Sequence, residues 1–429
     1  MKRILNLNYG AVHGAYWMLY GTATGFSSAL LLAAGYSNGE IGMILAAGSV
    51  IAVFLQPLIA DFADRSKKIS LTGVTEICTI ISMILYAGLF VLKHQSAALF
   101  VCYALILAWV ITLQPLLNSL CFRLERSGIH INFGVCRSVG SMGYSILCSV
   151  LGTLVENHGV SVLPAAGELT LAALLIALLC VKRNFDKACG QNGVAAGMTR
   201  ADKTAETSNT DVETAPTAQM EEPAETLSVK EEESADSITL PEFIRGNKLF
   251  IIMQMGIAGI FFSNAVLNNF MLQVVSGVGG NSEDMGRVLG LMAFLEIPAL
   301  MLFDKIHDRF SCQTILRFAS VCFILKVGVI YLAQNMMVIY LAHLLQPFSF
   351  GLFLPGIVAF TNETMRKGEA VKGQAWFTVM TTLASVISSI LGGIMLDTAG
   401  DKFMLLVATL VTAAGAAVIV LLVGRIKKK

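Results

Sequence analysis

Long runs of apolar residues recur along the whole chain, and they restrict its fold more than any other feature. Runs of about 18 or more such residues are long enough to cross a bilayer as helices. Of the 429 residues, 55% are hydrophobic and only 14% are charged. One or two soluble cores cannot bury that much apolar surface. In lipid the backbone must satisfy its own hydrogen bonds. The sequence therefore predicts an all-α membrane protein.

The apolar runs are separated by short loops and by one long polar segment. They predict twelve transmembrane helices, at 9–34, 41–61, 70–92, 97–120, 133–155, 163–181, 249–275, 284–303, 313–333, 336–361, 374–396 and 402–424. Residues 199–238 are rich in Thr, Ala, Ser and Glu and contain no aromatic residue, a composition typical of disorder. We therefore expect an N-terminal six-helix half at 1–181, a disordered cytoplasmic linker at 182–247 and a C-terminal six-helix half at 248–429.

Lysine and arginine are distributed unequally between the two sets of predicted loops. One set, which includes both chain ends, holds most of them, whereas the other holds only Lys93, Arg287 and Lys402. Cytoplasmic loops carry an excess of basic residues. The distribution predicts a multi-pass protein of the plasma or inner membrane with both termini in the cytoplasm.

The two predicted halves share a repeat. At one constant offset, four residues of the second predicted span recur in the eighth: Glu40, Gly42, Asp64 and Arg65 correspond to Asp284, Gly286, Asp308 and Arg309. Each set opens an apolar run with acidic-x-Gly and closes it with Asp-Arg. Such parallel repeats are typical of the two halves of major facilitator transporters, which bind substrate between the halves at the midplane.

The end of the second span, from Leu55 to Lys68, resembles the cytoplasmic signature of the major facilitator superfamily, in which Asp-Arg is followed by basic residues. The resemblance implies that Asp64 and Arg65 stabilise one arrangement of the halves. Their repeats Asp308 and Arg309 are expected to act in the same gating motif.

Four segments are also similar to the lactose permease, its oligosaccharide:proton symporter relatives and nucleoside:proton symporters. They are Gln56-Pro57-Leu58, Gly134 to Tyr144, Met285-Gly286 with Pro298, and His343 to Phe348. The resemblance implies that Arg137 binds sugar hydroxyls and that Tyr144 stacks on the sugar ring. Lys326 falls where the family has an arginine that assists the coupling carboxylate, and His343 matches a histidine of the tenth helix.

Three positions depart from that family's pattern. Asn118 stands near its fourth-helix glutamate, Gln346 replaces its proton-carrying glutamate, and Arg287 replaces an eighth-helix acid. Asn118 and Gln346 are candidate partners for a hydroxylated substrate, and each is equally suited to bonding between helices.

Charged residues inside a bilayer cost about 2.5–3.5 kcal/mol each on insertion scales and often mark transport pathways. Glu296 and Lys326 are the deepest such pair in the second half of the chain. Proton coupling and a purely structural ion pair both remain open for them. For Arg137 the alternative is an interfacial arginine that snorkels to the membrane surface, and for His343 it is a buried packing residue.

Other functional classes find little support in the sequence. No Walker loop, catalytic triad or dinucleotide fingerprint occurs, so an enzyme and a bound cofactor are not expected. The nine cysteines include no Cys-x-x-Cys pair, and no metal site is predicted from them. A net charge of +1 gives no reason to expect nucleic acid as a partner.

The residues and the resemblance together predict a secondary transporter that works as a monomer in the lipid bilayer. It would import a small hydroxylated solute (a sugar, an oligosaccharide or a nucleoside) with protons, by alternating access. Arg137, Tyr144, Asn118 and Gln346 would bind substrate, and Glu296, Lys326 and His343 would couple protons. Export of amphipathic drugs or metabolites is the alternative within transport. A non-transporting sensor or scaffold is the alternative outside it, and deletion of residues 199–225 would disable only such a linker-dependent sensor.

Overall fold

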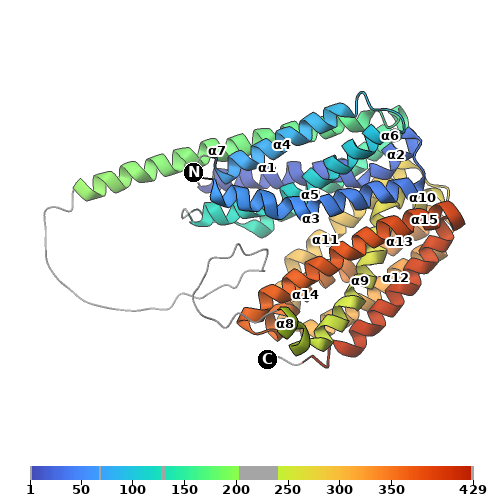
Figure 1. Cartoon of the computed structure of the whole chain (residues 1–429). Helices are drawn as coiled ribbons and strands as arrows, with labels where there is room; N and C mark the ends of the chain where they lie inside the picture. The colour runs from blue at the N-terminus through green and yellow to red at the C-terminus, as the bar shows by residue number, and fades with distance from the viewer. Residues whose placement is uncertain (1, 67–68, 127–128, 130, 202–239, 427–429) are drawn as a thin grey trace.

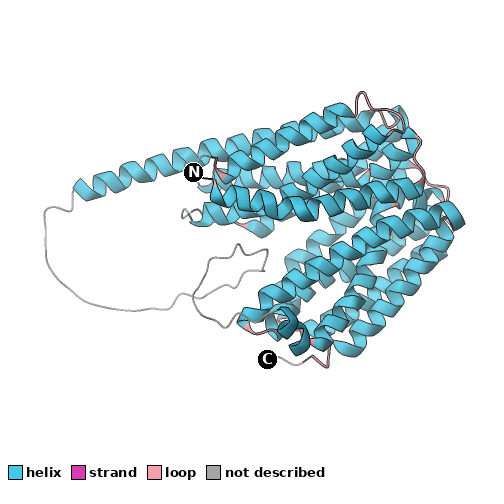
Figure 2. Ribbon diagram, in the orientation of Figure 1, coloured by secondary structure: helices cyan, strands magenta, loops and turns pink. Residues whose placement is uncertain are grey.

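The computed structural model describes residues 2–66, 69–126, 129, 131–201 and 240–426, and within them all regular secondary structure is helical (Figures 1 and 2). The first part of the chain forms α1 (Lys2–Tyr20), the π-helical segment η1 (Gly21–Gly25), α2 (Ser27–Ala34), α3 (Asn38–Arg65), α4 (Leu71–Gly88), α5 (Ala97–Arg126), α6 (Phe133–His158) and α7 (Val162–Ala201).

The second part of the chain begins after residue 239. It forms α8 (Leu240–Gly246), α9 (Lys248–Asn269), α10 (Met271–Ser276), α11 (Ser282–His307), α12 (Cys312–Leu332), α13 (Met336–His343), the π-helical segment η2 (Pro347–Gly351), α14 (Leu352–Thr364) and α15 (Lys367–Leu422). The all-α membrane architecture expected from the apolar runs is therefore present.

Ten helical segments of the described chain are long and apolar enough to cross a membrane. The first predicted span, 9–34, is interrupted by η1 and falls outside these ten. The last two predicted spans are joined in α15, which bends at Gly400, where the backbone adopts a left-handed φ of 80°. Length and composition alone do not show which helices cross a membrane. The count of twelve transmembrane helices therefore stays a prediction.

The predicted linker at 182–247 is helical at both of its ends. α7 continues to Ala201, and α8 occupies 240–246. Two contacts explain why α7 extends past residue 181: Lys182 pairs with Glu76 at 3.1 Å, and the Phe185 ring packs beneath the guanidinium of Arg123. The expected disorder concerns residues 202–239, which lie outside the described residues.

α3 and α11 begin with the same local structure. The Ser37 hydroxyl accepts a hydrogen bond from the N–H of Glu40, and the Glu40 carboxylate accepts one from the N–H of Ser37. Asn281 and Asp284 form the same reciprocal capping box. Capping boxes satisfy N–H groups that a helix start leaves without intrahelical partners. The repeated residues Glu40 and Asp284 thus occupy equivalent structural positions.

Two bundles of helices approach each other at one end of the molecule, which we call the contact end (Figure 1). Here α3 packs against α15, and α6 packs against α11. A Cβ added to Gly42 would overlap the carbonyl oxygen of Ser389, and one added to Gly286 would lie 2.7 Å from the Cα of Gly152. The repeated glycines therefore let backbone meet backbone at both crossings.

The opposite end, where the two ends of the described chain lie in Figure 1, carries the Asp-Arg motifs. Arg65 is exposed and pairs with Asp61 one turn earlier in α3, at 2.6 Å. Asp308 and Arg309, directly after α11, are also exposed. The side chain of Asp64 lies outside the described part of the structure. We retain the division into two halves and a linker as a proposal.

Candidate functional site

Gln346 lies between the two charged residues that the sequence placed deepest in the second half of the chain. Its side-chain oxygen accepts a 2.7 Å hydrogen bond from Lys326 Nζ. Its amide nitrogen donates a 2.6 Å hydrogen bond to Glu296 Oε1. An amide can donate to a carboxylate and accept from an ammonium group at the same time. Glu296 and Lys326 are therefore joined through one side chain instead of by a direct ion pair.

Two helices and one turn position this chain of polar groups. Glu296 comes from α11, Lys326 from the middle of α12, and Gln346 from the turn between α13 and η2. Lys326 is completely buried, and it is the only fully buried lysine or arginine among the described residues. Because an unpaired buried ammonium group is very costly, the hydrogen bond from Lys326 to Gln346 stabilises the fold.

The π-helical segment η2 brings the main chain close to Glu296. A Cβ on Gly351 would lie 2.8 Å from the Cβ of Ala299 and 3.9 Å from the Cα of Glu296. η2 begins at Pro347, which has no N–H to contribute to a regular helix. Because π-helical turns are frequent at functional sites, η2 is a structural sign of a site that sequence periodicity did not predict.

His343 belongs to the same group of residues. Its Nδ1 forms a 2.8 Å hydrogen bond with the carbonyl oxygen of Ile339, and the side chain is fully buried. Its Nε2 has no hydrogen-bond partner among the described residues. Its ring is near enough to Lys326 for the two groups to interact electrostatically.

Arg137 is held against an aromatic side chain of the first bundle. Its guanidinium carbon lies 3.9 Å from the centre of the Trp17 ring, and its Nη1 donates a 2.8 Å hydrogen bond to the Ser141 hydroxyl. Gly140 makes this possible, because a Cβ at that position would overlap the indole of Trp17. A tryptophan face attracts a cation by about 0.5–2 kcal/mol, so Trp17 supports the orientation of Arg137.

Tyr144 lies two helical turns after Arg137, on the same side of α6. Its ring packs against η1, within 3.3 Å of the position that a Cβ on Gly21 would take. Glu296 interacts electrostatically with Tyr144 and Arg137 of the first bundle, as well as with Lys326 of its own bundle. Residues from both bundles therefore surround Glu296.

Asn118 lies in a different environment. It is buried on α5, next to Leu117, whose carbonyl oxygen accepts a 3.0 Å hydrogen bond from Tyr9 Oη. The role of Asn118 in substrate binding stays a prediction.

The comparisons with known proteins identify the family. A model described as the MFS_1 like family matches residues 9–407. The chain belongs to the MFS_1 like family. An uncharacterized transporter of Bacillus subtilis (strain 168), YwbF, is 20% identical over 372 residues, which cover 84% of this chain and 79% of YwbF.

Two kinds of solved structure share the fold of this MFS_1 like protein. A mutant of the nucleoside transporter NupG superposes with a TM-score of 0.71 at 15% identity, covering 99% of this chain and all of that one. An auto inhibited POT family peptide transporter superposes with a TM-score of 0.66 at 11% identity, covering 99% and 97%. At these identities the likeness concerns the fold alone. The resemblance to major facilitators is confirmed, and the protein is a multi-pass membrane transporter and not an enzyme.

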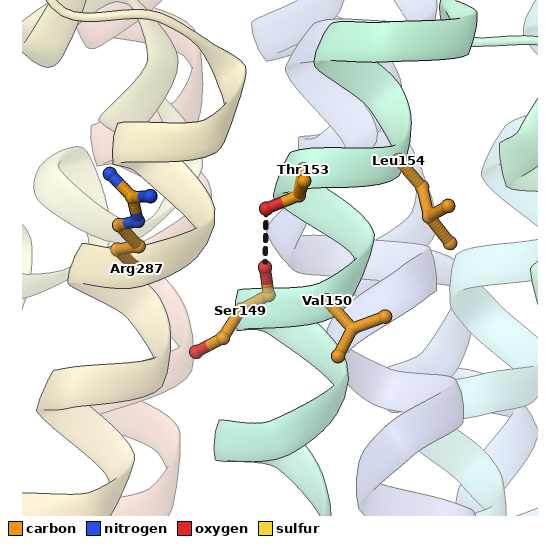
Figure 3. A pocket seen from close by; sticks show the side chains of 5 residues that line it. All are labelled: Ser149, Val150, Thr153, Leu154 and Arg287. Carbon is orange, nitrogen blue, oxygen red and sulfur yellow. Dashed lines mark hydrogen bonds between the residues drawn. The ribbon is translucent and has the colours of Figure 1, made fainter.

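A cavity of about 410 Å³ lies on the side of this MFS_1 like transporter, between α6 and α11. It is lined by Ser149, Val150, Thr153, Leu154 and Arg287 (Figure 3). Arg287 pairs with Glu283, one turn earlier in α11, at 2.5 Å. Arg287, which the resemblance placed at the position of an acid in the eighth helix, lines this cavity and lies apart from the residues around Glu296.

Two carboxylates at the contact end were not singled out from the sequence of this transporter. Asp397 of α15 accepts hydrogen bonds from the N–H groups of Asn38 and Gly39 at the start of α3. Glu156 of α6 accepts one from the N–H of Ser282 at the start of α11. Anions are favoured at helix N-termini, so each helix start is capped by the opposite bundle. The constant offset of the repeat was the sequence signal that could have pointed to these two helix starts, because it makes α3 and α11 equivalent.

Proposed function

We propose that this transporter imports a small hydroxylated solute, a sugar or a nucleoside, together with protons. The observation that carries the proposal is the polar chain in which Gln346 joins Glu296 to Lys326. Arg137, held by the other bundle, acts on the same carboxylate. A site to which both bundles contribute is affected whenever the bundles move relative to each other.

The substrate-binding part of the proposal rests on Arg137, Trp17 and Tyr144. A guanidinium group offers several donors in a fixed plane, and these suit neighbouring hydroxyl groups of a sugar or ribose. Aromatic faces suit the apolar side of a sugar ring or a nucleobase. NupG, which shares the fold, is a nucleoside transporter by name, and this favours testing nucleosides first. Asn118 and Gln346 are proposed as further partners.

The coupling part rests on Glu296, Lys326 and His343. A cation near a carboxylate favours its ionised form, and withdrawal of the cation favours uptake of a proton. Movement of α12 relative to α11 would lengthen or shorten the path from Lys326 through Gln346 to Glu296. One proton would then be loaded and released in each transport cycle. His343, buried beside Lys326, would respond to the same movement.

The cycle would alternate between contact at one end of the molecule and contact at the other. In this proposal the two halves, 1–181 and 248–429, rock about the central site within the plasma or inner membrane. Both termini and the linker lie in the cytoplasm, so the contact end faces outward. The Asp64-Arg65 and Asp308-Arg309 motifs then stabilise closure at the cytoplasmic end. A single copy of the chain suffices for this mechanism.

Reconstitution of Glu296→Gln in liposomes tests coupling directly. The variant keeps the shape of the side chain but cannot exchange a proton. We expect it to lose uphill accumulation of labelled nucleoside or sugar and substrate-induced proton uptake, while it still exchanges the same substrate across the membrane. Asp304→Asn, an exposed carboxylate of the same helix, is the matched control and should accumulate substrate normally.

Two further variants locate the proton. Lys326→Ala should impair accumulation, and the double variant with Glu296→Gln should be no worse than Glu296→Gln alone, because both act on one step. Persistence of substrate-induced proton uptake in Glu296→Gln would remove Glu296 from the coupling mechanism. Absence of uptake of every sugar and nucleoside by the unaltered protein would reject the substrate class.

A further inference from the structure

Three side chains with metal-binding atoms converge away from the central site. They are His307 at the end of α11, Cys312 at the start of α12 and Glu363 near the end of α14. One ligand atom from each lies within 4.8 Å of the others. Loops and helix ends distant in sequence thus bring a nitrogen, a sulfur and an oxygen ligand together, directly beside the Asp308-Arg309 motif.

The triangle formed by these atoms has the size of one face of a zinc tetrahedron. His307 Nε2 lies 2.8 Å from Glu363 Oε1, Cys312 Sγ lies 3.4 Å from the same oxygen, and Sγ lies 3.9 Å from Nε2. Bond lengths of tetrahedral zinc give about 3.3 Å between nitrogen and oxygen ligands and about 3.6 Å from sulfur to either. Shifts of a few tenths of an ångström bring each pair to its required separation.

The surroundings of the cluster also suit metal binding. Cys312 is completely buried at the first position of α12, so its sulfur is fixed in place beside Glu363. The ring of His307 stacks on Phe303 at an interplanar angle of 15°, which fixes its orientation. The side chains of His307 and Glu363 retain 32% and 27% of their exposure, so water has access to a fourth coordination position.

We propose that His307, Cys312 and Glu363 bind a zinc ion, with water as the fourth ligand. Thiolate and imidazole ligands select zinc over magnesium and calcium, which prefer oxygen. The ion joins the α11–α12 loop to α14 and fixes the segment that carries Asp308 and Arg309. The sequence predicted no metal site, because the three ligands come from separate segments and form no short motif.

Zinc binding by the purified full-length protein tests this site without reference to transport. After removal of metal, titration against a chromogenic chelator should show one zinc per chain. Cobalt as a substitute should give a sulfur-to-metal charge-transfer band. Cys312→Ser, His307→Ala and Glu363→Gln should each weaken zinc binding at least tenfold, and Cys312→Ser should remove the band.

Cys322→Ser, at another buried cysteine of α12, and His94→Ala, at an exposed histidine, are the matched controls and should bind zinc normally. The melting temperature of each metal-free variant identifies those that fail to fold. Sub-stoichiometric zinc binding, or a cobalt spectrum of the unaltered protein without the charge-transfer band, would overturn the proposal. Loss of the band in Cys322→Ser would also overturn it, because the thiolate ligand would then lie elsewhere.

Discussion

Asp397 Oδ2 accepts a 2.7 Å hydrogen bond from the backbone N–H of Gly39 and so joins α15 to the first turn of α3. Asp397 Oδ1 accepts two more, from the backbone and the side chain of Asn38. The side chain of Asn38 in turn accepts a 2.8 Å hydrogen bond from Gln273. One end of the molecule is thus closed by polar contacts that separate when the bundles separate.

We expect Asp397→Asn to weaken the contact end. Burial raises the pKa of Asp397, but hydrogen bonds from Gly39, Asn38 and Ser37 outweigh this effect and hold the pKa below its ordinary value of 3.8. A carboxylate whose pKa is lower in the closed conformation stabilises that conformation when the pH is above the ordinary pKa. It loses this contribution as the pH falls through the lowered pKa. Because Asp397 is exposed, its replacement by asparagine should shift the equilibrium between the closed and the separated contact end about fivefold toward separation, or ~1 kcal/mol. The shift should be the same at any pH from about 5 to 8.

Spin labels at His94 and Phe403, exposed on the two sides of this contact, would report the separation by distance measurements. Thr398→Ala is the control, because the Thr398 hydroxyl bonds only one turn back, to the carbonyl oxygen of Ile394. Distances in Asp397→Asn equal to those of the unaltered protein would show that the contact does not hold this end closed.

Gly286→Ala should prevent closure at the second crossing. The added methyl group would overlap the carbonyl oxygen of Cys148 and lie 2.7 Å from the Cα of Gly152. Backbone atoms cannot move aside as a flexible side chain can, and overpacking of this kind costs about 1–3 kcal/mol. Transport should fall at least tenfold while substrate still binds. In Gly328→Ala the methyl group would meet only Thr409, at 3.9 Å, and transport should be retained. Normal transport by Gly286→Ala would contradict the prediction.

Arg137→Lys should reduce uptake at least tenfold, and Arg137→Ala should abolish it, with normal expression and membrane insertion. Lysine cannot cover the Trp17 ring and bond to Ser141 with one planar group. Ser141→Ala, which removes only the neighbouring hydroxyl, should have a smaller effect. Uptake of labelled substrate, normalised to protein in the membrane, provides the measurement. Normal uptake by Arg137→Ala would instead indicate an arginine that snorkels to the membrane surface.

Gln346→Leu should destabilise the protein as well as inactivate it. The substitution removes the hydrogen-bond acceptor of buried Lys326 and the amide donor to Glu296, at a cost of about 3–5 kcal/mol. Thermal unfolding in detergent should show a clear loss of stability. Gln346→Glu retains a hydrogen-bond acceptor for Lys326 and should lose less thermal stability than Gln346→Leu. Gln374→Leu, whose amide bonds to the carbonyl oxygen of Val358 at a half-buried position, is the control. An unchanged melting temperature in Gln346→Leu would refute the expectation.

The sequence predicted the helical membrane fold, because hydrophobic runs and backbone hydrogen bonding in lipid permit few alternatives. It also predicted the repeat, and the repeated residues Gly42 and Gly286 both lie at crossings between the bundles. Their role as points of backbone contact was not predicted. Close approach depends on how two helices cross, and a pattern within one helix does not contain that information.

The central residues were partly predictable. The cost of burying charge identified Glu296 and Lys326, but not that Gln346 lies between them. Trp17 of the first span lies beneath Arg137, a contact between two helices that was not predicted from the sequence. The π-helical segment η1 interrupts the periodicity of that span, so the direction of each side chain cannot be extrapolated along it.

The π-helical segments η1 and η2 have a consequence for how side chains turn. Each accommodates an additional residue, and one residue of an α-helix corresponds to about 100° of rotation about its axis. The parts of a span before and after such a segment therefore have separate angular settings. Rewinding Gly21–Gly25 or Pro347–Gly351 into an α-helix would therefore rotate Trp17 relative to α2, or Gln346 relative to α14.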